Sequence, residues 1–395
     1  MIYCDAAAST PVRPEVLAAI WPLLSERFGN PSSHHTVGED AAAALADARQ
    51  RIAGLLGCRA SEIIFTSGGT EAINLALKGI ALANPRSRHI VSSAVEHPAV
   101  TQTLDYLRRM HDFRITTLPV NGDGLVDPGA LGAALTPETT LCTLMYANNE
   151  VGSIQPIAEC AALCRDQGVP FHSDAVQAAG WLPLDVEALG VDALSVSGHK
   201  IGAPQGTGFL YLRRRIRVEP VLHGGGQERG HHSGTQNVAG AVGLAVALEL
   251  AQRCLPAAAE RSAQLRDKLV SSITTAVPGA RVTGHPSRRL PALASFCFPG
   301  IGGEAVLLEL ERRGIVSSSG SACAAGSTEP SAVLLALGLS PEDALTALRL
   351  SWTAQTSDAE LAEVASAVVS AIESVQKIAG PAGTLPERES AVPLD

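Results

Sequence analysis

The stretch DALSVSGHKIGAPQGTGFLYL (192–212) decides the fold of this chain. It holds two short runs of apolar and β-branched residues, 192–198 and 207–212, on either side of a turn rich in Gly and Pro, which is the pattern of two buried strands. Strand-like runs also precede it, separated by helical patterns such as 71–82 and 98–111. Strands that alternate with helices are typical of βαβ units. We therefore expect an α/β protein with a mainly parallel, seven-stranded sheet, whose other strands are 62–67, 89–93, 114–120, 140–146 and 169–174.

A second, smaller α/β domain is expected because 395 residues exceed the size at which one hydrophobic core keeps growing. The apolar helical segment 240–251 closes the large domain. After residue 255 come a helix (257–276), a strand near 294–298, a helix (304–313), a Ser/Gly-rich loop (317–327) and further helices to about 377. We expect an N-terminal segment that packs with the small domain (1–14), a large domain (15–255), a small domain (256–378) and a flexible tail (379–395).

Composition and charge exclude several classes of protein. Hydrophobic residues make up 46% and charged residues 17%, as in a compact globular chain. A net charge of −9 argues against a nucleic-acid-binding surface. No basic segment is followed by an apolar core, and no stretch approaches the roughly 20 apolar residues of a membrane span. The eight cysteines form no CxxC pair. We expect a soluble, cytoplasmic protein that binds neither membrane nor nucleic acid directly.

Four segments with chemically useful residues follow predicted strands, where ligands bind in open parallel sheets. TSGGTEA (66–72) runs from a strand through two glycines into a helix that begins near Thr70, and the N–H groups there can receive a phosphate. The alternative is an ordinary turn with a Thr cap. HSDAVQ (172–177) ends a strand with Asp174, which can keep a pyridinium nitrogen protonated, although an Asp at a strand end is also a common helix cap.

The other two segments carry a lysine and a histidine. In SVSGHKIGAPQGTG (195–208), Lys200 can form a Schiff base with an aldehyde cofactor when its pKa is lowered; the alternative is a surface lysine in a loop. In SSAVEHPAV (92–100), His97 can stack on an aromatic ring and transfer protons, although a lone histidine is usually a surface or core residue. The presence of all four segments at strand ends favours one shared cofactor site.

A series of motifs in a fixed order covers nearly all of residues 2–355. They are CDAAASTPVRPEV, FGNPSSHH, TSGGTEAINLALKG, EHPAV, YANNEVGSIQPI, HSDAVQAAG, SVSGHKIGAPQGTGFLYLRR, HGGGQERGHHSGTQN, SSGSACAAGSTEPSAVLLALG and LRLSW. In this combination the chain resembles the cysteine desulfurases of iron–sulfur cluster assembly, a branch of the class V aminotransferases among the fold-type I pyridoxal-phosphate (PLP) enzymes. The resemblance implies PLP as cofactor, L-cysteine as substrate, a homodimer and a sulfur-acceptor protein as partner.

The resemblance also implies roles for particular residues. Lys200 matches the Schiff-base lysine, Asp174 the pyridinium partner and His97 the residue that stacks on the ring. Cys323 in SGSAC matches the cysteine that takes the sulfur as a persulfide. Further positions match residues that touch the phenolic oxygen (Gln177), the phosphate (Gly69, Thr70, Ser197 and His199), the phosphate of the neighbouring subunit (Thr235) and the substrate (Asn149 and Arg349, with Arg349 on the carboxylate).

These roles imply that L-cysteine is converted to L-alanine. Lys200 removes the α-proton, His97 assists proton transfer, and Cys323 attacks the substrate sulfur as a thiolate. The small residues around Cys323 let it approach the substrate and then deliver the sulfur; the alternative is a flexible connector with an incidental cysteine. Other candidate functions are a selenocysteine lyase, a class V aminotransferase and a non-catalytic sulfur-transfer scaffold. A cluster scaffold, a tRNA-thiolation relay and a DNA-modification system all remain open as sulfur acceptors.

Two departures from the family pattern stand out. His232 replaces the usual Arg before Ser-Gly-Thr, so a charge near the cofactor or the dimer interface is weaker or pH-dependent. The stretch 8–11 reads Ala-Ser-Thr-Pro in place of ATTP, a milder change. The histidine pairs at 34–35 and 231–232 have no matching Cys or carboxylate pattern, and we expect no metal site.

Overall fold

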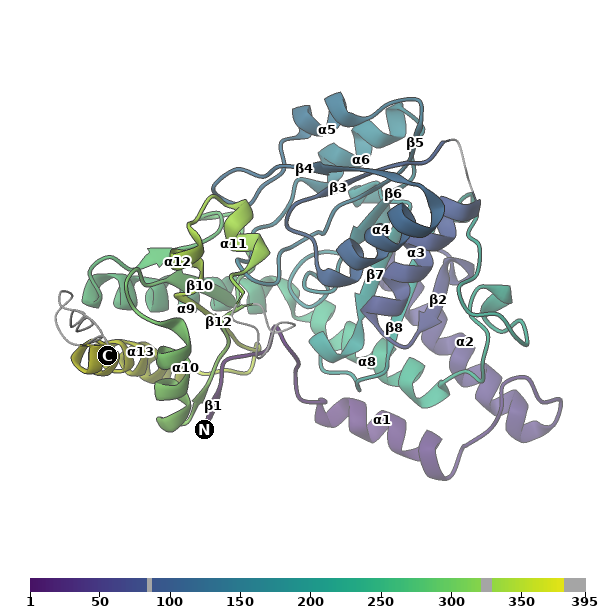
Figure 1. Ribbon diagram of the computed structural model, residues 1–395. Coiled ribbons are helices and arrows are strands. Elements are labelled where there is room, and N and C mark those ends of the chain that lie inside the picture. The colour runs from purple at the N-terminus through teal and green to yellow at the C-terminus, as the bar shows by residue number, and fades with distance from the viewer. Residues whose placement is uncertain (84–86, 321–328, 380–395) are drawn as a thin grey trace, which may run out of the picture.

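The computed structural model describes residues 1–83, 87–320 and 329–379, and Cys323 lies outside these ranges. Figure 1 shows two units side by side, the larger built around a long sheet and the smaller holding both β1 and the last helix. The bounds of the N-terminal segment, the two domains and the tail remain a prediction. The fold class is confirmed, because the large sheet has seven strands and is mostly parallel.

The large sheet has the order β2-β8-β7-β6-β5-β3-β4. Strand β8 runs antiparallel to both of its neighbours, and the remaining pairs are parallel. Its carboxyl edge therefore collects the ends of six strands. The strands are β2 (Ile63–Thr66), β3 (His89–Ser93), β4 (Arg114–Leu118), β5 (Thr139–Thr143), β6 (Phe171–Asp174), β7 (Ala193–Ser197) and β8 (Gly208–Leu212).

Both faces of this sheet are covered, which explains why its central strands are apolar throughout. Successive side chains of a strand point to opposite faces. Accordingly, Leu210 and Leu212 of β8 join one apolar cluster, and Phe209 and Tyr211 join another. Helices pack on both faces: α1 (Pro14–Ser25), α2 (Thr36–Leu56), α3 (Gly69–Ala83), α4 (Pro98–His111), α5 (Pro128–Ala134), α6 (Ile157–Asp166), α7 (Val186–Leu189) and α8 (Val238–Arg253), with short 3₁₀ turns η1 (Ala60–Glu62), η2 (Gly198–Lys200) and η3 (Glu228–Gly230).

The smaller unit has its own core around an antiparallel sheet of order β12-β10-β9. The N-terminal strand β1 pairs in parallel with β11, with Ile2 opposite Ile315, so the start of the chain lies in this unit (Figure 1). Its elements are β1 (Ile2–Tyr3), α9 (Leu255–Ala276), β9 (Arg281–Val282), β10 (Leu293–Cys297), α10 (Gly303–Arg312), β11 (Ile315–Val316), α11 (Ala332–Ala336), α12 (Pro341–Ala344), β12 (Ala347–Ser351) and α13 (Asp358–Ala379).

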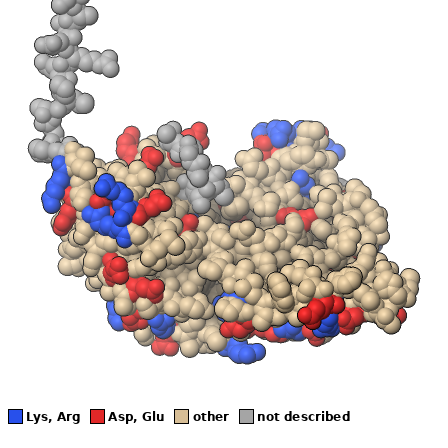
Figure 2. Space-filling view, turned by 90° about the horizontal axis from the view of Figure 1, so that it is seen from below, with Lys and Arg blue, Asp and Glu red and all other residues tan. Residues whose placement is uncertain are grey.

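Charged side chains are mixed on the face of the molecule seen in Figure 2, where Lys and Arg alternate with Asp and Glu and do not form one basic area. Among the described helices, none is both long and apolar enough to cross a membrane singly, and only the bent pair α8 and α9 passes that test of length and composition together.

Candidate functional site

Four of the predicted residues lie at the carboxyl edge of the large sheet. Asp174 is the last residue of β6, and Ser197 is the last residue of β7. Gly69 opens α3 shortly after β2, and His97 caps α4 shortly after β3. Because these strands run in the same direction, their ends bring the side chains to one edge, as the sequence predicted.

Lys200 lies at the end of η2, directly after β7, and is held by the N-terminal segment. Its Nζ donates hydrogen bonds to the carbonyl oxygens of Ala7 (2.5 Å) and Ala8 (2.8 Å). The Nε2 of Gln177 donates to the same carbonyl oxygen of Ala7, at 2.9 Å. Backbone from residues 7 and 8 therefore orients both the lysine amine and the glutamine amide.

Asp174 is a buried carboxyl group at the end of β6. Its Oδ1 accepts a hydrogen bond from the N–H of Val176, at 2.9 Å. Burial raises its pKa from 3.8 to about 6, although that hydrogen bond and the charge of Lys200 oppose the change. A positively charged group placed against this carboxylate would recover the lost solvation.

Two imidazoles near Lys200 are held neutral. Burial lowers the pKa of His97, and the charge of Lys200 lowers it further. The same two causes lower the pKa of His199 to about 4. The Nδ1 of His97 accepts from the N–H of Ala99 at 3.0 Å, so its neutral ring carries the proton on Nε2. A neutral, fixed imidazole suits stacking on an aromatic ring better than a charged one.

The chain packs tightly where β2 leads into α3, and glycines make this possible. A Cβ on Gly69 would stand 2.6 Å from Cγ2 of Val176 and 3.3 Å from Cβ of Ser197, so a larger residue has no room there. Gly68 adopts φ +155, and a Cβ on Gly208 would lie 2.6 Å from the Cα of Gly68. The first N–H groups of a helix have no carbonyl partner within it, so those of α3 can receive a phosphate at this turn.

Thr235 is exposed and belongs to a different part of the surface. It lines a cavity of about 190 Å³ together with Ser67 and His232. His232 forms an ion pair with Glu71 of α3, with 2.8 Å between Nε2 and Oε1. The other oxygen of Glu71 accepts from the N–H of Ser67 at 2.6 Å. His232 thus connects the loop of Thr235 to the first turn of α3, next to Thr70.

Arg349 and Asn149 lie together beside the start of the Cys323 loop. Nη1 of Arg349 donates to the carbonyl oxygens of Asn149 (2.8 Å) and Gly320 (3.1 Å). Nη2 forms an ion pair with Asp5 at 2.6 Å. Nε is buried and has no hydrogen-bond partner among the described residues. Arg349 is therefore fixed in place, with one donor unused.

Comparisons with known proteins show the family to which the chain belongs. The family model for aminotransferase class V matches residues 2–364. A cysteine desulfurase of Trichormus azollae is 44% identical over 96% of this chain and 94% of its own length. The chain belongs to the class V aminotransferases, among the cysteine desulfurases.

Solved structures of this family are similar as well. One described as a NifS-like protein has a TM-score of 0.88 and 36% identity, and the match covers 94% of this chain and 99% of that chain. Another, described as SspA in complex with cysteine, has a TM-score of 0.80 and 35% identity over 90% of this chain and 100% of its own. The family resemblance seen in the sequence is confirmed, and PLP is the cofactor of this family.

The residues of the site fit PLP. Lys200 offers a primary amine for the aldehyde, and the carboxylate of Asp174, whose pKa is raised by burial, would be stabilised by a pyridinium nitrogen. The start of α3 at Gly69 offers backbone N–H groups to a phosphate. The amine, the carboxylate and this helix start all belong to elements at the same sheet edge.

Two residues of the site were not found by sequence reasoning. Glu96 is completely buried beside His97, and burial raises its pKa to about 8. Its Oε1 accepts from Oγ of Ser93 (2.6 Å) and from the N–H of Met145 (2.9 Å), and its Oε2 has no partner among the described residues. The other is Asp5, the ion-pair partner of Arg349. The sequence offered one indication of Glu96, which is a carboxylate in the short link between a predicted buried strand and the helix that follows it.

Proposed function

We propose that this protein is a PLP-dependent cysteine desulfurase that converts L-cysteine to L-alanine and takes the sulfur onto Cys323 as a persulfide. The observation that carries the proposal is the position of Lys200 at the same sheet edge as the buried carboxylate of Asp174. Family membership and the SGSAC motif around Cys323 support the choice of reaction.

Each residue has a defined task in this proposal. When bound, PLP withdraws electrons from the amino acid and thereby weakens its Cα–H and Cβ–S bonds. Asp174 holds the pyridinium proton, Gln177 the phenolic oxygen and His97 the face of the ring. Phosphate contacts come from Gly69, Thr70, Ser197 and His199, and Arg349 with Asn149 holds the substrate carboxylate.

Proton and sulfur transfer are assigned to two residues. The Nζ of Lys200 takes the α-proton of the substrate, with His97 assisting proton transfer. The thiolate of Cys323 attacks the substrate sulfur, so the S–S bond of a persulfide forms as the Cβ–S bond breaks and the carbon product leaves as alanine. A sulfur-acceptor protein then removes the outer sulfur.

We also propose a cytoplasmic homodimer in which Thr235 reaches the phosphate of the partner subunit. Thr235 is exposed, as this role requires. Helix α1 supports an association because Leu17, Trp21 and Leu24 form an exposed apolar stripe at helical spacing. The cysteines in the described part of the chain are free thiols, as in proteins of a reducing compartment. Sedimentation equilibrium of the wild type would give the mass of a dimer.

Reduction with borohydride followed by digestion and mass spectrometry tests the central claim. We expect the pyridoxyl label on Lys200, and ³⁴S from labelled cysteine on Cys323. A Cys323→Ser variant that released alanine and sulfide at the full rate would instead indicate a lyase or an aminotransferase. A label on another lysine, or none, would refute the site and revive the non-catalytic scaffold.

A further inference from the structure

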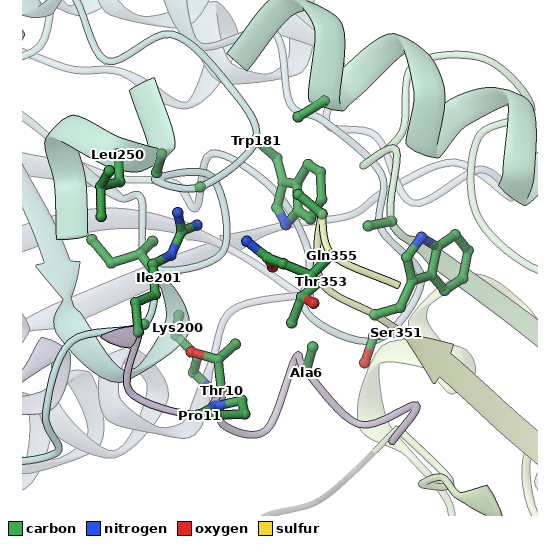
Figure 3. Close-up of a pocket in the computed structure, with 18 of the residues that line it drawn as sticks. Ala6, Thr10, Pro11, Trp181, Lys200, Ile201, Leu250, Ser351, Thr353 and Gln355 are labelled. Atoms are coloured by element: carbon green, nitrogen blue, oxygen red, sulfur yellow. The ribbon is translucent and has the colours of Figure 1, made fainter. Parts of the chain in front are cut away.

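A cavity of about 660 Å³ opens between the two units, on the side of Lys200 where the N-terminal segment runs. Three parts of the chain line it: residues 6–15, the large unit near Lys200 and α8, and the link between β12 and α13. Figure 3 shows Lys200 and Thr10 at one end and Ser351 at the other, with Trp181, Thr353 and Gln355 between them. This volume is within the range of cavities that bind drug-sized molecules.

The cavity differs from the proposed catalytic site. Of the residues assigned to cofactor or substrate, Lys200 and Gln177 are the two that touch it; Asp174, His97 and Arg349 do not. Its walls are mostly apolar, with aliphatic side chains such as Ile201 and Leu250. We therefore consider a separate function for this cavity.

Arg13 is the distinctive group in the cavity wall. Its guanidinium makes no hydrogen bond and no ion pair with any other residue in the described ranges. The carboxylate of Glu15, the single acidic lining residue, is not paired with it either. Burial lowers the pKa of Arg13, although the charges of Glu15 and Cys254 oppose the shift, which is the behaviour of a partly desolvated cation.

The backbone holds Arg13 in this position. Its N–H donates to the carbonyl oxygen of Gly202 at 3.0 Å. Gly202 has φ +88, and a Cβ there would lie 2.6 Å from Cγ of Arg13, so the glycine makes room for the arginine stem. The stem of Arg13, as far as Nε, thus packs over the turn that follows Lys200, and its guanidinium lies in the cavity wall. Restricting the stem in this way lowers the entropy cost of binding a ligand.

Two indoles complete the lining. Trp181 packs against the cores of both units. Trp352 is only 1% exposed, and its Nε1 has no hydrogen-bond partner in the part of the chain that the structure describes. Buried polar groups are normally hydrogen-bonded, so this N–H is a second donor without an acceptor beside the same cavity.

We propose that this cavity binds an organic monocarboxylate with an apolar body, whose carboxylate is received by Arg13. One planar guanidinium matches one carboxylate in a forked pair. Phosphate groups are usually held by several N–H donors or cations at once, whereas here the amine of Lys200 already donates to the carbonyl oxygens of Ala7 and Ala8, which leaves Arg13 as the principal anion-binding group. A cationic ligand would be repelled by the charges of both Arg13 and Lys200.

Tryptophan fluorescence offers a direct binding test, because two of the three tryptophans of the chain line the cavity. The third, Trp21, is 68% exposed on α1 and is removed in a W21F protein. Titration of W21F holoenzyme with 3-phenylpropionate is expected to give a saturable change. The isosteric amine 3-phenylpropylamine and the alcohol 3-phenylpropanol should bind at least about tenfold more weakly, since they lack the charge-assisted pair.

Alkylation of Cys254 gives a second readout at the same cavity. Cys254 is an exposed free thiol in the lining. Saturating 3-phenylpropionate should slow its modification by iodoacetamide, as measured by peptide mass spectrometry. Cys58, a free thiol away from the cavity, should react at an unchanged rate.

Variants at Arg13 decide the assignment. R13Q is expected to weaken binding by about 10- to 100-fold, and R27Q, which alters an exposed arginine paired with Asp40, should leave it unchanged. If R13Q does not fold, R13K keeps the charge and the stem without the fork and should still bind more weakly than the wild type.

Equal binding by the folded Arg13 variant, or no saturation in W21F, would overturn the proposal. So would an R13Q protein whose KM for L-cysteine rises by the same factor, since Arg13 would then belong to the substrate site.

Discussion

The guanidinium of Arg349 and the carboxylate of Asp5 form an ion pair of 2.6 Å, although 344 residues separate them in the sequence. Asp5 follows β1, and Arg349 lies in β12, so the pair ties the start of the chain to the proposed substrate-binding residue. Side-chain exposure is 2% for Arg349 and 17% for Asp5. The charge offered to a substrate carboxylate is therefore already partly balanced within the protein.

Replacement of Arg349 by Lys is expected to raise the KM for L-cysteine about 10- to 100-fold with a smaller effect on kcat. An ammonium group keeps the charge but cannot form the forked pair with a carboxylate. Steady-state measurement of alanine formation gives both constants. Arg289→Lys is a matched control, because Arg289 is also a buried arginine of the smaller unit that donates to backbone carbonyls. A KM that stays constant in the Arg349→Lys enzyme would remove this residue from substrate binding.

Asp5→Asn is expected to lower the free energy of unfolding by roughly 2–4 kcal/mol, because the buried guanidinium then lacks a counter-ion and retains only amide and carbonyl partners. Urea denaturation of the holoenzyme measures the change. Asp40→Asn, in an exposed ion pair with Arg27, should have no measurable effect. Equal stability of both variants would mean that the Asp5 pair is no more than a surface contact.

The sequence was sufficient to predict the seven strands and the four segments at their ends. Buried strands such as β7 have a continuous apolar pattern, and parallel order places their ends at one edge. The predicted strand 140–146 was too long at its end: β5 stops at Thr143, because the N–H of Met145 donates to the carboxylate of Glu96. An apolar run in the sequence indicates that a segment is buried. It does not indicate where the strand ends, because that depends on a hydrogen-bond partner elsewhere in the chain.

Contacts between distant segments were beyond sequence reasoning. Three features depend on how the N-terminal segment crosses between the units. They are the ion pair of Asp5 with Arg349, the hydrogen bond from Lys200 to Ala7, and the position of Arg13 in the cavity wall. None of these has a periodic pattern or a fixed spacing. The departure at His232 was visible in the sequence, whereas its partner Glu71 was not.

Asp174→Asn is expected to separate cofactor binding from stability. Because burial raises the pKa of Asp174 above its ordinary 3.8, its ionisation destabilises the folded apoprotein increasingly as the pH rises from about 4 through about 6. At pH 7.5 the Asn apoprotein should therefore have a higher melting temperature than the wild type. Its affinity for PLP should fall at least about 30-fold, since the pyridinium loses its carboxylate. Calorimetry and equilibrium dialysis measure the two effects. A parallel loss of stability and affinity in the apoprotein would argue for a purely structural aspartate.

His232 is expected to make PLP binding depend on pH. The hydrogen bond to Glu71 raises its pKa above 6.5, with burial opposing and the charges of Glu71 and Glu228 adding to the rise. Burial of Glu71 acts to raise its own pKa, but hydrogen bonds from His232 and Ser67 outweigh it and bring the pKa to about 2. Glu71 thus stays ionised above pH 5, and Glu228 is already paired with Arg49.

The sign of the effect follows from these directions. A histidine whose folded-state pKa is raised stabilises the pair fully below about pH 6.5, and that contribution is lost as the pH rises through the folded value. The pair joins the loop of Thr235 to the first turn of α3, so both proposed phosphate contacts are held less firmly at high pH. The dissociation constant of PLP should rise about three- to tenfold between pH 6.5 and 9, as measured by equilibrium dialysis. His232→Arg should keep the tight value across this range, because its charge does not titrate there, and His232→Gln should show the weak value throughout. A wild-type profile parallel to that of the Arg variant would place the titrating group elsewhere.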